Sequence, residues 1–235
     1  MELVLIRHPA VAIKRGICYG RSEVPLAGDA RAEADALLER LKVLAAAAAP
    51  VTALAGAAAT ETQVARRRMS AGGRLLLAPS MIATSPLMRC MCIAARLGER
   101  IGCSITPDVR LCELDFGRWE LQRWEDLNRD ALDAWARDLE YGRPHGGESV
   151  RRVIDRVSAW LAQAQAASDE ETHDRPYVVW AISHAGPIRL LTAYALALPA
   201  TACTHWPLAM GGMVWLRNTA SASSRMPWAL GCWNR

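Results

Sequence analysis

The chain has 235 residues, of which 51% are hydrophobic and 22% are charged, and its formal net charge at pH 7 is +4. These fractions are ordinary for a globular protein and exclude disorder along the whole chain. The small net charge, with no basic run interleaved with aromatic residues, argues against a nucleic-acid-binding surface. The densest basic cluster, Arg66-Arg67-Arg68, is interpreted as a solvated loop.

The cysteines and the amino terminus indicate where the protein works. Seven cysteines form an odd set, and the Cys90-x-Cys92 spacing is not the Cys-x-x-Cys of a redox or zinc motif. Reduced thiols in a cytoplasm are the simplest interpretation. The amino terminus does not resemble a signal peptide, and Pro50 and Gly56 interrupt the alanine-rich stretch before residue 60. We therefore expect a cytoplasmic protein without a membrane span.

The chain opens on an aliphatic run, Leu3-Val4-Leu5-Ile6, without polar alternation. Such a run is typical of a strand covered on both faces, as in the parallel sheet of an α/β domain. It stops at Arg7-His8, so both side chains are predicted at the carboxyl end of the strand, the edge where open α/β sheets bind ligands. Residues 9–26 carry glycines and prolines at turn spacing and are predicted to form a loop, from which Arg21 could reach this edge.

A helix is predicted from Asp29 to just before Pro50, because Asp is a good N-cap, apolar residues recur at helical spacing, and proline ends a helix. Between about residues 50 and 80 the composition turns to Ala, Gly, Thr and Arg. We interpret this stretch as an extended connection, which costs little because closure entropy grows only logarithmically with loop length.

A short strand is predicted over residues 81–84. Ser85-Pro86 then has the form of an N-cap followed by proline at the first helical position, so a helix is predicted to begin there. Arg89 falls in the first turn of that helix, on the same ligand edge.

A loop with Glu113 is predicted to follow, held against the core by Phe116 and Trp119. Two helices are predicted next, over about 124–141 and 149–166, the second with a clear apolar stripe. Their tryptophans are interpreted as core residues rather than cofactor contacts. Glu148 is interpreted as a helix N-terminal charge that the macrodipole favours.

A second buried strand is predicted over residues 177–182, and it runs into Ser183-His184. Gly186-Pro187 is predicted to open another helix, and two short strands are predicted near the end of the chain, over 213–216 and 228–232, with a Ser-rich turn between them. Two buried strands therefore deliver one histidine each to the same sheet edge.

Together these elements predict an α/β protein with a three-layer α/β/α architecture and a mostly parallel central sheet. A chain of this length can bury one large core, so we expect a single domain over residues 1–235 that includes the connection at about 50–80.

Several stretches resemble the histidine phosphatase superfamily, the phosphoglycerate-mutase-like fold. The first is Leu5-Ile6-Arg7-His8-Pro9, followed by Cys18-Tyr19-Gly20-Arg21-Ser22-Glu23-Val24-Pro25-Leu26. The others, in the family's order, are Ser85-Pro86-Leu87-Met88-Arg89-Cys90, Leu111-Cys112-Glu113-Leu114-Asp115-Phe116-Gly117-Arg118-Trp119-Glu120 and Ser183-His184-Ala185-Gly186. The ordered set spans most of the chain and is most similar to the α-ribazole-phosphatase-like branch. Two departures are Pro9 and Ala185, where much of the superfamily has glycine, and a methyl group at Ala185 could crowd a bound phosphate.

The resemblance implies a phosphomonoesterase that works without a cofactor or metal. His8 would attack phosphorus and form a phosphohistidine, Glu113 would protonate the leaving group, and His184 would donate to the phosphate oxygens. Arginine suits a phosphate dianion because its planar fork donates two parallel hydrogen bonds, which is the role implied for Arg7 and Arg89. Arg21 is expected among the substrate-binding residues. Two cations beside His8 should lower its pKa and keep the imidazole free.

The nearest branch implies α-ribazole 5′-phosphate as the substrate, an intermediate of cobalamin nucleotide-loop assembly. Two alternatives stay open: a phosphoglycerate-mutase-like phosphotransferase, for which no feature signals substrate retention, and a non-catalytic protein that binds phosphorylated ligands. No His-x-His, His-Glu-x-x-His or Gly-x-Ser-x-Gly motif points to a metallohydrolase or a serine hydrolase. The sequence leaves the physiological substrate and the oligomeric state open, with a homodimer among the candidates for the latter. His145, His173 and His205 are predicted in loops, and His205 is the one that could approach the substrate.

Overall fold

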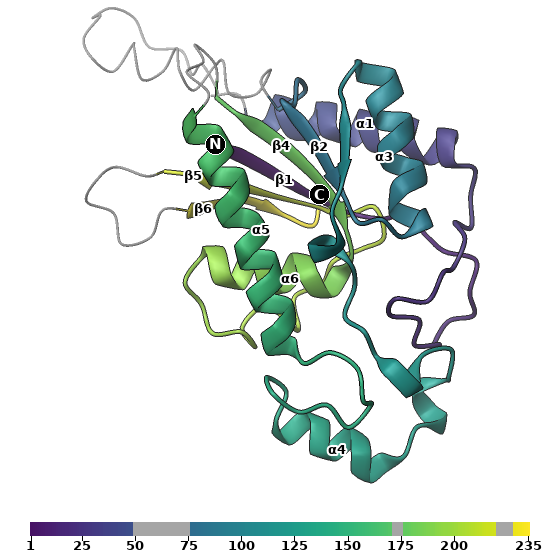
Figure 1. Ribbon diagram of the computed structural model, residues 1–235. Coiled ribbons are helices and arrows are strands. Elements are labelled where there is room, and N and C mark those ends of the chain that lie inside the picture. The colour runs from purple at the N-terminus through teal and green to yellow at the C-terminus, as the bar shows by residue number, and fades with distance from the viewer. Residues whose placement is uncertain (49–75, 171–175, 220–227) are drawn as a thin grey trace, which may run out of the picture.

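A computed structural model describes residues 1–48, 76–170, 176–219 and 228–235 (Figure 1). The Arg66-Arg67-Arg68 cluster, His173, most of the connection at about 50–80 and most of the Ser-rich turn lie outside the described residues. The connection re-enters the described part at Leu76. This side chain is fully buried, and its carbonyl accepts a hydrogen bond from the indole of Trp180 at 2.8 Å.

The described strands form one sheet in the order β3-β2-β4-β1-β5-β6. Neighbouring strands from β3 to β1 run parallel, whereas β5 pairs antiparallel with β1 and with β6. The expectation of a mostly parallel sheet is confirmed, with an antiparallel edge. The strands are β1 (Glu2–Arg7), β2 (Met81–Thr84), β3 (Ile105–Pro107), β4 (Val178–Ser183), β5 (Met213–Asn218) and β6 (Trp228–Trp233).

Helices cover both faces of the sheet (Figure 1). Side chains alternate along β1: Val4 and Ile6 pack in one apolar cluster with residues of α1 (Ala30–Ala48) and α3 (Met88–Ile101). Leu3 and Leu5 pack in the other, with residues of α5 (Val150–Glu170) and α6 (Ala185–Ala195). The three-layer α/β/α architecture is therefore confirmed, and burial on both faces explains the unbroken aliphatic run of β1.

The helix predicted at Ser85-Pro86 begins later, at Met88, and Leu87 rather than Ser85 occupies its N-cap position. The prediction of the N-cap was wrong because two contacts between distant parts of the chain replace it. The Ser85 hydroxyl lies 2.8 Å from a ring nitrogen of His184, and the free Met88 amide donates to the Glu23 carboxylate at 3.1 Å.

The single helix predicted over 124–141 is divided. Trp124–Asp126 forms a 3₁₀ turn and Leu127 is extended. A separate helix, α4 (Arg129–Arg137), then follows. Asn128 caps it, its side-chain oxygen accepting from the Ala131 amide at 2.9 Å. Strand β3 was not predicted at all.

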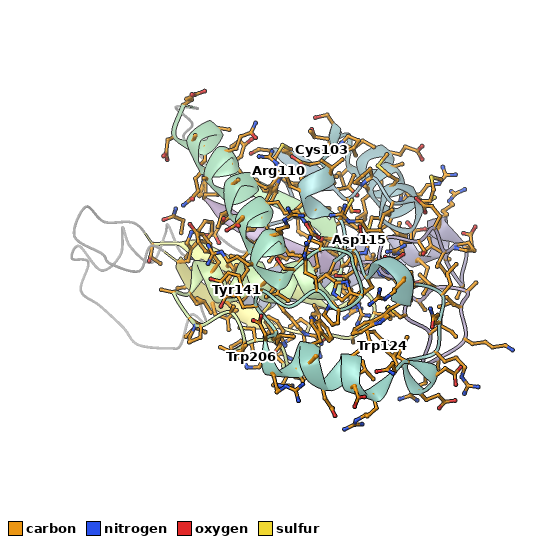
Figure 2. The ribbon with its side chains drawn as sticks, turned by 60° about the horizontal axis from the view of Figure 1, so that its bottom comes forward. Cys103, Arg110, Asp115, Trp124, Tyr141 and Trp206 are labelled. Atoms are coloured by element: carbon orange, nitrogen blue, oxygen red, sulfur yellow. The ribbon has the colours of Figure 1, made fainter. Side chains whose placement is uncertain are left out.

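An aromatic cluster joins α4 to the segments before and after it, and it comprises Phe116, Trp119, Trp124, Trp135 and His145. Asp115 and Trp124 belong to this part of the chain, on the side of the molecule that Figure 2 brings forward. The tryptophans predicted to pack do so, since Trp160 of α5 is also buried in the core. Within the described ranges, no helix is both long and apolar enough to cross a membrane.

Candidate active site

The two predicted histidines meet at the carboxyl edge of the sheet. β1 and β4 pair in parallel with Arg7 opposite Ser183, so His8 and His184 leave adjacent strands at the same level. The backbone amide of His8 donates to the Ser183 carbonyl at 3.0 Å, and the two imidazole centroids lie 5.1 Å apart. Both side chains are buried, with 1% and 0% exposure.

His8 is held as a neutral imidazole in a defined tautomer. Its Nδ1 lies 2.7 Å from the Pro9 carbonyl oxygen, which can only accept, so Nδ1 carries the proton and Nε2 keeps its lone pair. The pKa of His8 is lowered to about 3, chiefly by burial, with smaller lowering by the charges of Arg89 and Arg7 and an opposing effect of the Pro9 hydrogen bond. The expected direction is confirmed, but burial rather than the arginines is the largest cause.

His184 is also neutral, because burial lowers its pKa well below the ordinary value, with smaller contributions from His8 and Arg89. Its Nε2 lies 2.8 Å from the Ser85 hydroxyl. The Leu87 amide donates to that hydroxyl oxygen at 3.4 Å, so the hydroxyl proton is available to Nε2. We assign the ring proton of His184 to Nδ1, because the other acceptor within reach of the Ser85 hydroxyl, the Cys112 sulfur at 3.7 Å, is a weak one. His184 can therefore donate a hydrogen bond without a positive charge.

Arg89 and Arg7 are fixed by backbone carbonyls. Arg89 is fully buried and donates to the carbonyls of Ser22 at 2.8 Å and Gly20 at 2.6 Å. Arg7 donates to the Leu208 carbonyl at 2.5 Å. Arg89 also lies over the ring of Tyr19, at 5.2 Å from its centroid. Both guanidinium groups are thus positioned before any ligand arrives.

Three buried nitrogens in this site have no hydrogen-bond partner among the residues that the structure describes: Arg7 Nε, Arg89 Nε and His184 Nδ1. All three can donate. Buried donors are almost always paired in folded proteins, because an unpaired one costs the free energy of its desolvation. Unpaired donors beside a neutral imidazole are the arrangement expected of an anion-binding site.

Glu113 is brought to the first turn of α6, the helix that follows His184. Its carboxylate accepts from the Leu114 amide at 2.9 Å and lies 3.4 Å from the Gly186 amide. A Cβ atom at Gly186 would lie 2.3 Å from Glu113 Oε1, so any other residue there would displace the Glu113 carboxylate from this position. Glu113 is partly buried, and its carboxylate lies at the turn that follows His184.

Arg21 lies close to the site but supports Glu113. Its Nε donates to the Glu113 carbonyl at 3.1 Å, and its Nη2 pairs with Glu148 at 3.0 Å. Arg156 of α5 makes a parallel set of contacts, at 3.1 Å to the Glu113 carbonyl and 2.9 Å to Glu148. A direct contact of Arg21 with substrate stays a prediction.

Glu148 lies two residues before α5, in keeping with its interpretation as a helix N-terminal charge, but it also forms two ion pairs. Its side chain, 12% exposed, bridges Arg21 and Arg156 and so braces the Glu113 loop. Sequence reasoning missed Glu148, Arg156 and Ser85 as parts of the site, because their partners lie far away in the chain. The local signal for Glu148 was the pair Gly146-Gly147 before it, of which Gly147 packs closely against the Asp115 carbonyl.

The two other histidines that the structure describes differ in burial. His205 is exposed, and His145 is buried in the aromatic cluster, where its Nδ1 accepts from the Gly147 amide at 3.0 Å. Over the described ranges, no three His, Cys, Asp or Glu side chains gather in a way that could hold a metal ion.

Comparison with known proteins identifies the family. The model of the histidine phosphatase superfamily (branch 1) matches residues 66–225, more than half of the chain. The chain belongs to the histidine phosphatase superfamily.

Two of its relatives are named for the same substrate. Glucosyl-3-phosphoglycerate phosphatase of Mycobacterium tuberculosis is 36% identical over 142 residues, covering 57% of this chain and 60% of the relative, so the match spans less than two thirds of that protein. The structure of a mycobacterial glucosyl-3-phosphoglycerate phosphatase with inorganic phosphate has a TM-score of 0.71 and 26% identity, covering 100% of this chain and 97% of that one.

A structure titled as a putative α-ribazole-5′-phosphate phosphatase from Escherichia coli has a TM-score of 0.70 at 20% identity, covering 100% of this chain and 96% of the other. This identity is low enough that the likeness shows the shared fold alone.

Proposed function

We propose that the protein is a phosphomonoesterase that works through a phosphohistidine at His8. One observation carries the proposal: a buried, neutral imidazole with a fixed tautomer lies near three buried donors that have no partner in the described part of the chain. The superfamily membership supports the same reading, and so does the phosphate complex of the mycobacterial relative.

The free lone pair of His8 Nε2 is the proposed nucleophile. The Nδ1 proton is held by the Pro9 carbonyl, so no rearrangement is needed before attack. As the N–P bond forms at Nε2, positive charge develops on the ring, and the nearby carbonyl oxygen and the incoming phosphate dianion both stabilise it. Water then cleaves the N–P bond and returns His8 to its free form.

The transferring phosphoryl group carries its charge on three equatorial oxygens. Arg7 and Arg89 would each direct an unpaired Nε at those oxygens, and the proton on His184 Nδ1 would supply a third hydrogen bond. The donors are already fixed by Leu208, Ser22 and Gly20, so little reorganisation is needed in the transition state.

The leaving alkoxide needs a proton, and Glu113 is the proposed donor. It lies in the first turn after His184, and its backbone carbonyl is fixed by Arg21 and Arg156. The negative charge of a bound phosphate favours the protonated carboxyl, which is the form that can act as an acid.

The physiological substrate is proposed as a small phosphorylated metabolite. α-Ribazole 5′-phosphate remains a candidate, but the relatives matched at higher identity are named for a phosphoglycerate ester, which favours that chemistry. A mutase and a non-catalytic binder remain as alternatives. The proposed hydrolase differs from both in forming a phosphoenzyme that water consumes.

Rapid quenching with a ³²P-labelled monoester tests the proposal. The trapped label should be acid-labile and base-stable, as a phosphohistidine is, and should be absent in His8→Ala. The exposed His205→Ala is the matched control and should label like the wild type. A label on serine, or turnover that persists without any label in the wild type and in His8→Ala, rejects the nucleophile assignment.

A further inference from the structure

Arg189 is a cation that the reaction proposed above does not use. It lies on α6, five residues after His184, and is partly buried. Residues three apart on a helix share a face, so Arg189 lies one turn beyond Gly186, whose amide faces the Glu113 carboxylate at 3.4 Å. This places the guanidinium on the leaving-group side of the site.

A loop holds Arg189 beside Arg7. The Nε of Arg189 donates to the Trp206 carbonyl at 2.9 Å, and Arg7 donates to the Leu208 carbonyl, two residues further along. Two like charges therefore converge on one short segment. The pKa of Arg189 is lowered by burial and by the charge of Arg7, while Glu113 opposes that effect.

Arg189 differs from the other arginines around Glu113 in having no carboxylate partner. Arg21 and Arg156 share Glu148. Arg189, by contrast, forms no ion pair among the residues that the structure describes, and its Nη groups donate to none of them. Binding of an anion is favourable at such a guanidinium, because it is partly buried, has free donors and lies next to a like charge.

We infer that Arg189 binds a second anionic group of the substrate, a carboxylate on the leaving-group side. This inference rests on the proposed phosphomonoesterase and adds a substrate class to it. Arg7 and Arg89 take the phosphate, Glu113 faces the bridging oxygen, and Arg189 receives the carboxylate beyond it. A phosphate ester of a hydroxy acid fits this spacing of charges, whereas α-ribazole 5′-phosphate has no carboxylate on its leaving group.

A matched pair of substrates tests the inference. 3-Phosphoglycerate and glycerol 3-phosphate have the same carbon chain and differ in a carboxylate against a hydroxymethyl group. We expect the wild type to favour 3-phosphoglycerate in kcat/KM by about 10-fold or more, and Arg189→Gln to reduce that ratio about 10- to 100-fold, the range for a charge-assisted hydrogen bond. Arg152→Gln removes the same charge from an exposed position on α5 and should keep the wild-type ratio.

Binding to the inactive His8→Ala variant separates the inference from the proposed reaction. Calorimetry should show 3-phosphoglycerate binding more tightly than glycerol 3-phosphate to His8→Ala, and the difference should disappear in His8→Ala/Arg189→Gln. Equal binding of the two ligands to His8→Ala, or an equal loss for both on Arg189→Gln, overturns the carboxylate site. A wild type that binds with this preference but forms no phosphoenzyme overturns the proposed reaction instead.

Discussion

At the scale of single residues, burial rather than charge sets the state of the site. His8 and His184 have lowered pKa values chiefly because both rings are removed from water, and the arginines add to an effect that burial already produces. A neutral imidazole is thus available at neutral pH. The lowered pKa of His8 instead makes the stability of the fold depend on pH.

The first residue-scale prediction concerns acid stability. The pKa of His8 is lowered from 6.5 to about 3, so between these values the unfolded chain binds a proton that the folded chain does not. Stability therefore falls as the pH drops through this window, with a contribution of about 1.4 kcal/mol per pH unit from one such group. His8→Gln should remove that slope. Urea unfolding between pH 7 and pH 4 measures it.

Parallel stability curves for the wild type and His8→Gln would contradict this assignment. If His8→Gln does not fold, the ring of His8 can be followed directly by NMR in the wild type. It should show no titration above about pH 4, and a midpoint near 6.5 would place His8 in water rather than in a buried site.

The second residue-scale prediction separates a proton donor from a residue that only shapes the site. General acid catalysis contributes about 10²–10⁴ in rate with a poor leaving group and little with a stable anion. Glu113→Gln should therefore slow single-turnover transfer from an alkyl monoester far more than from p-nitrophenyl phosphate. Glu23→Gln is the control, because the Glu23 carboxylate accepts a hydrogen bond from the Met88 amide at the start of α3. An equal loss with both leaving groups would assign the proton donor elsewhere.

At the scale of elements, residues 206–209 connect the site to the carboxyl-terminal strand. Their polar groups alternate in direction: the Trp206 and Leu208 carbonyls accept from Arg189 and Arg7, while the Pro207 carbonyl and the Ala209 amide bond Trp233 and Asn234. The antiparallel strands β5 and β6 therefore do more than extend the sheet. Trp233 at the end of β6 and Asn234 after it anchor the segment that positions two arginines.

The element-scale prediction follows from the Asn234 contact, at 2.7 Å from the Ala209 amide. Asn234→Ala removes a hydrogen bond worth about 1 kcal/mol and loosens the anchored segment, so KM for a phosphomonoester should rise several-fold with a smaller change in kcat. Asn234→Ser, which keeps an acceptor, should restore part of the loss. Ala229→Ser, on an exposed position of β6, is the control. An unchanged KM in Asn234→Ala would show that Arg7 does not depend on this anchor.

At the scale of the whole molecule, the sheet edge assembles the positive charge from distant parts of the chain. Arg7 comes from β1, Arg89 from α3 and Arg189 from α6, and each is held by a backbone carbonyl of another segment. Phosphoryl transfer requires such charge, which two-metal phosphatases obtain from ions. Here fixed guanidinium groups are proposed to supply it.

Activity should therefore survive exhaustive dialysis against EDTA. The measurement is kcat/KM for one phosphomonoester before and after chelation, with a known two-metal phosphatase treated in parallel as the positive control. Activity that is lost on chelation and restored by Mg²⁺ or Zn²⁺ would contradict the assignment of the phosphate charge to arginines.

The sequence by itself determined the features that depend on the pattern of apolar residues within one segment. Unbroken aliphatic runs marked β1 and β4, the histidines directly after them were predicted at one edge, and parallel pairing brings them there. Tertiary structure decided what depends on partners far apart in the chain: the start of α3 at Met88, the short strand β3, the bridge from Glu148 to Arg156, and the carbonyl that holds Arg189. The physical reason is that periodicity records burial along one segment, whereas a cap, an ion pair or a fixed guanidinium depends on which other segment folding brings against it.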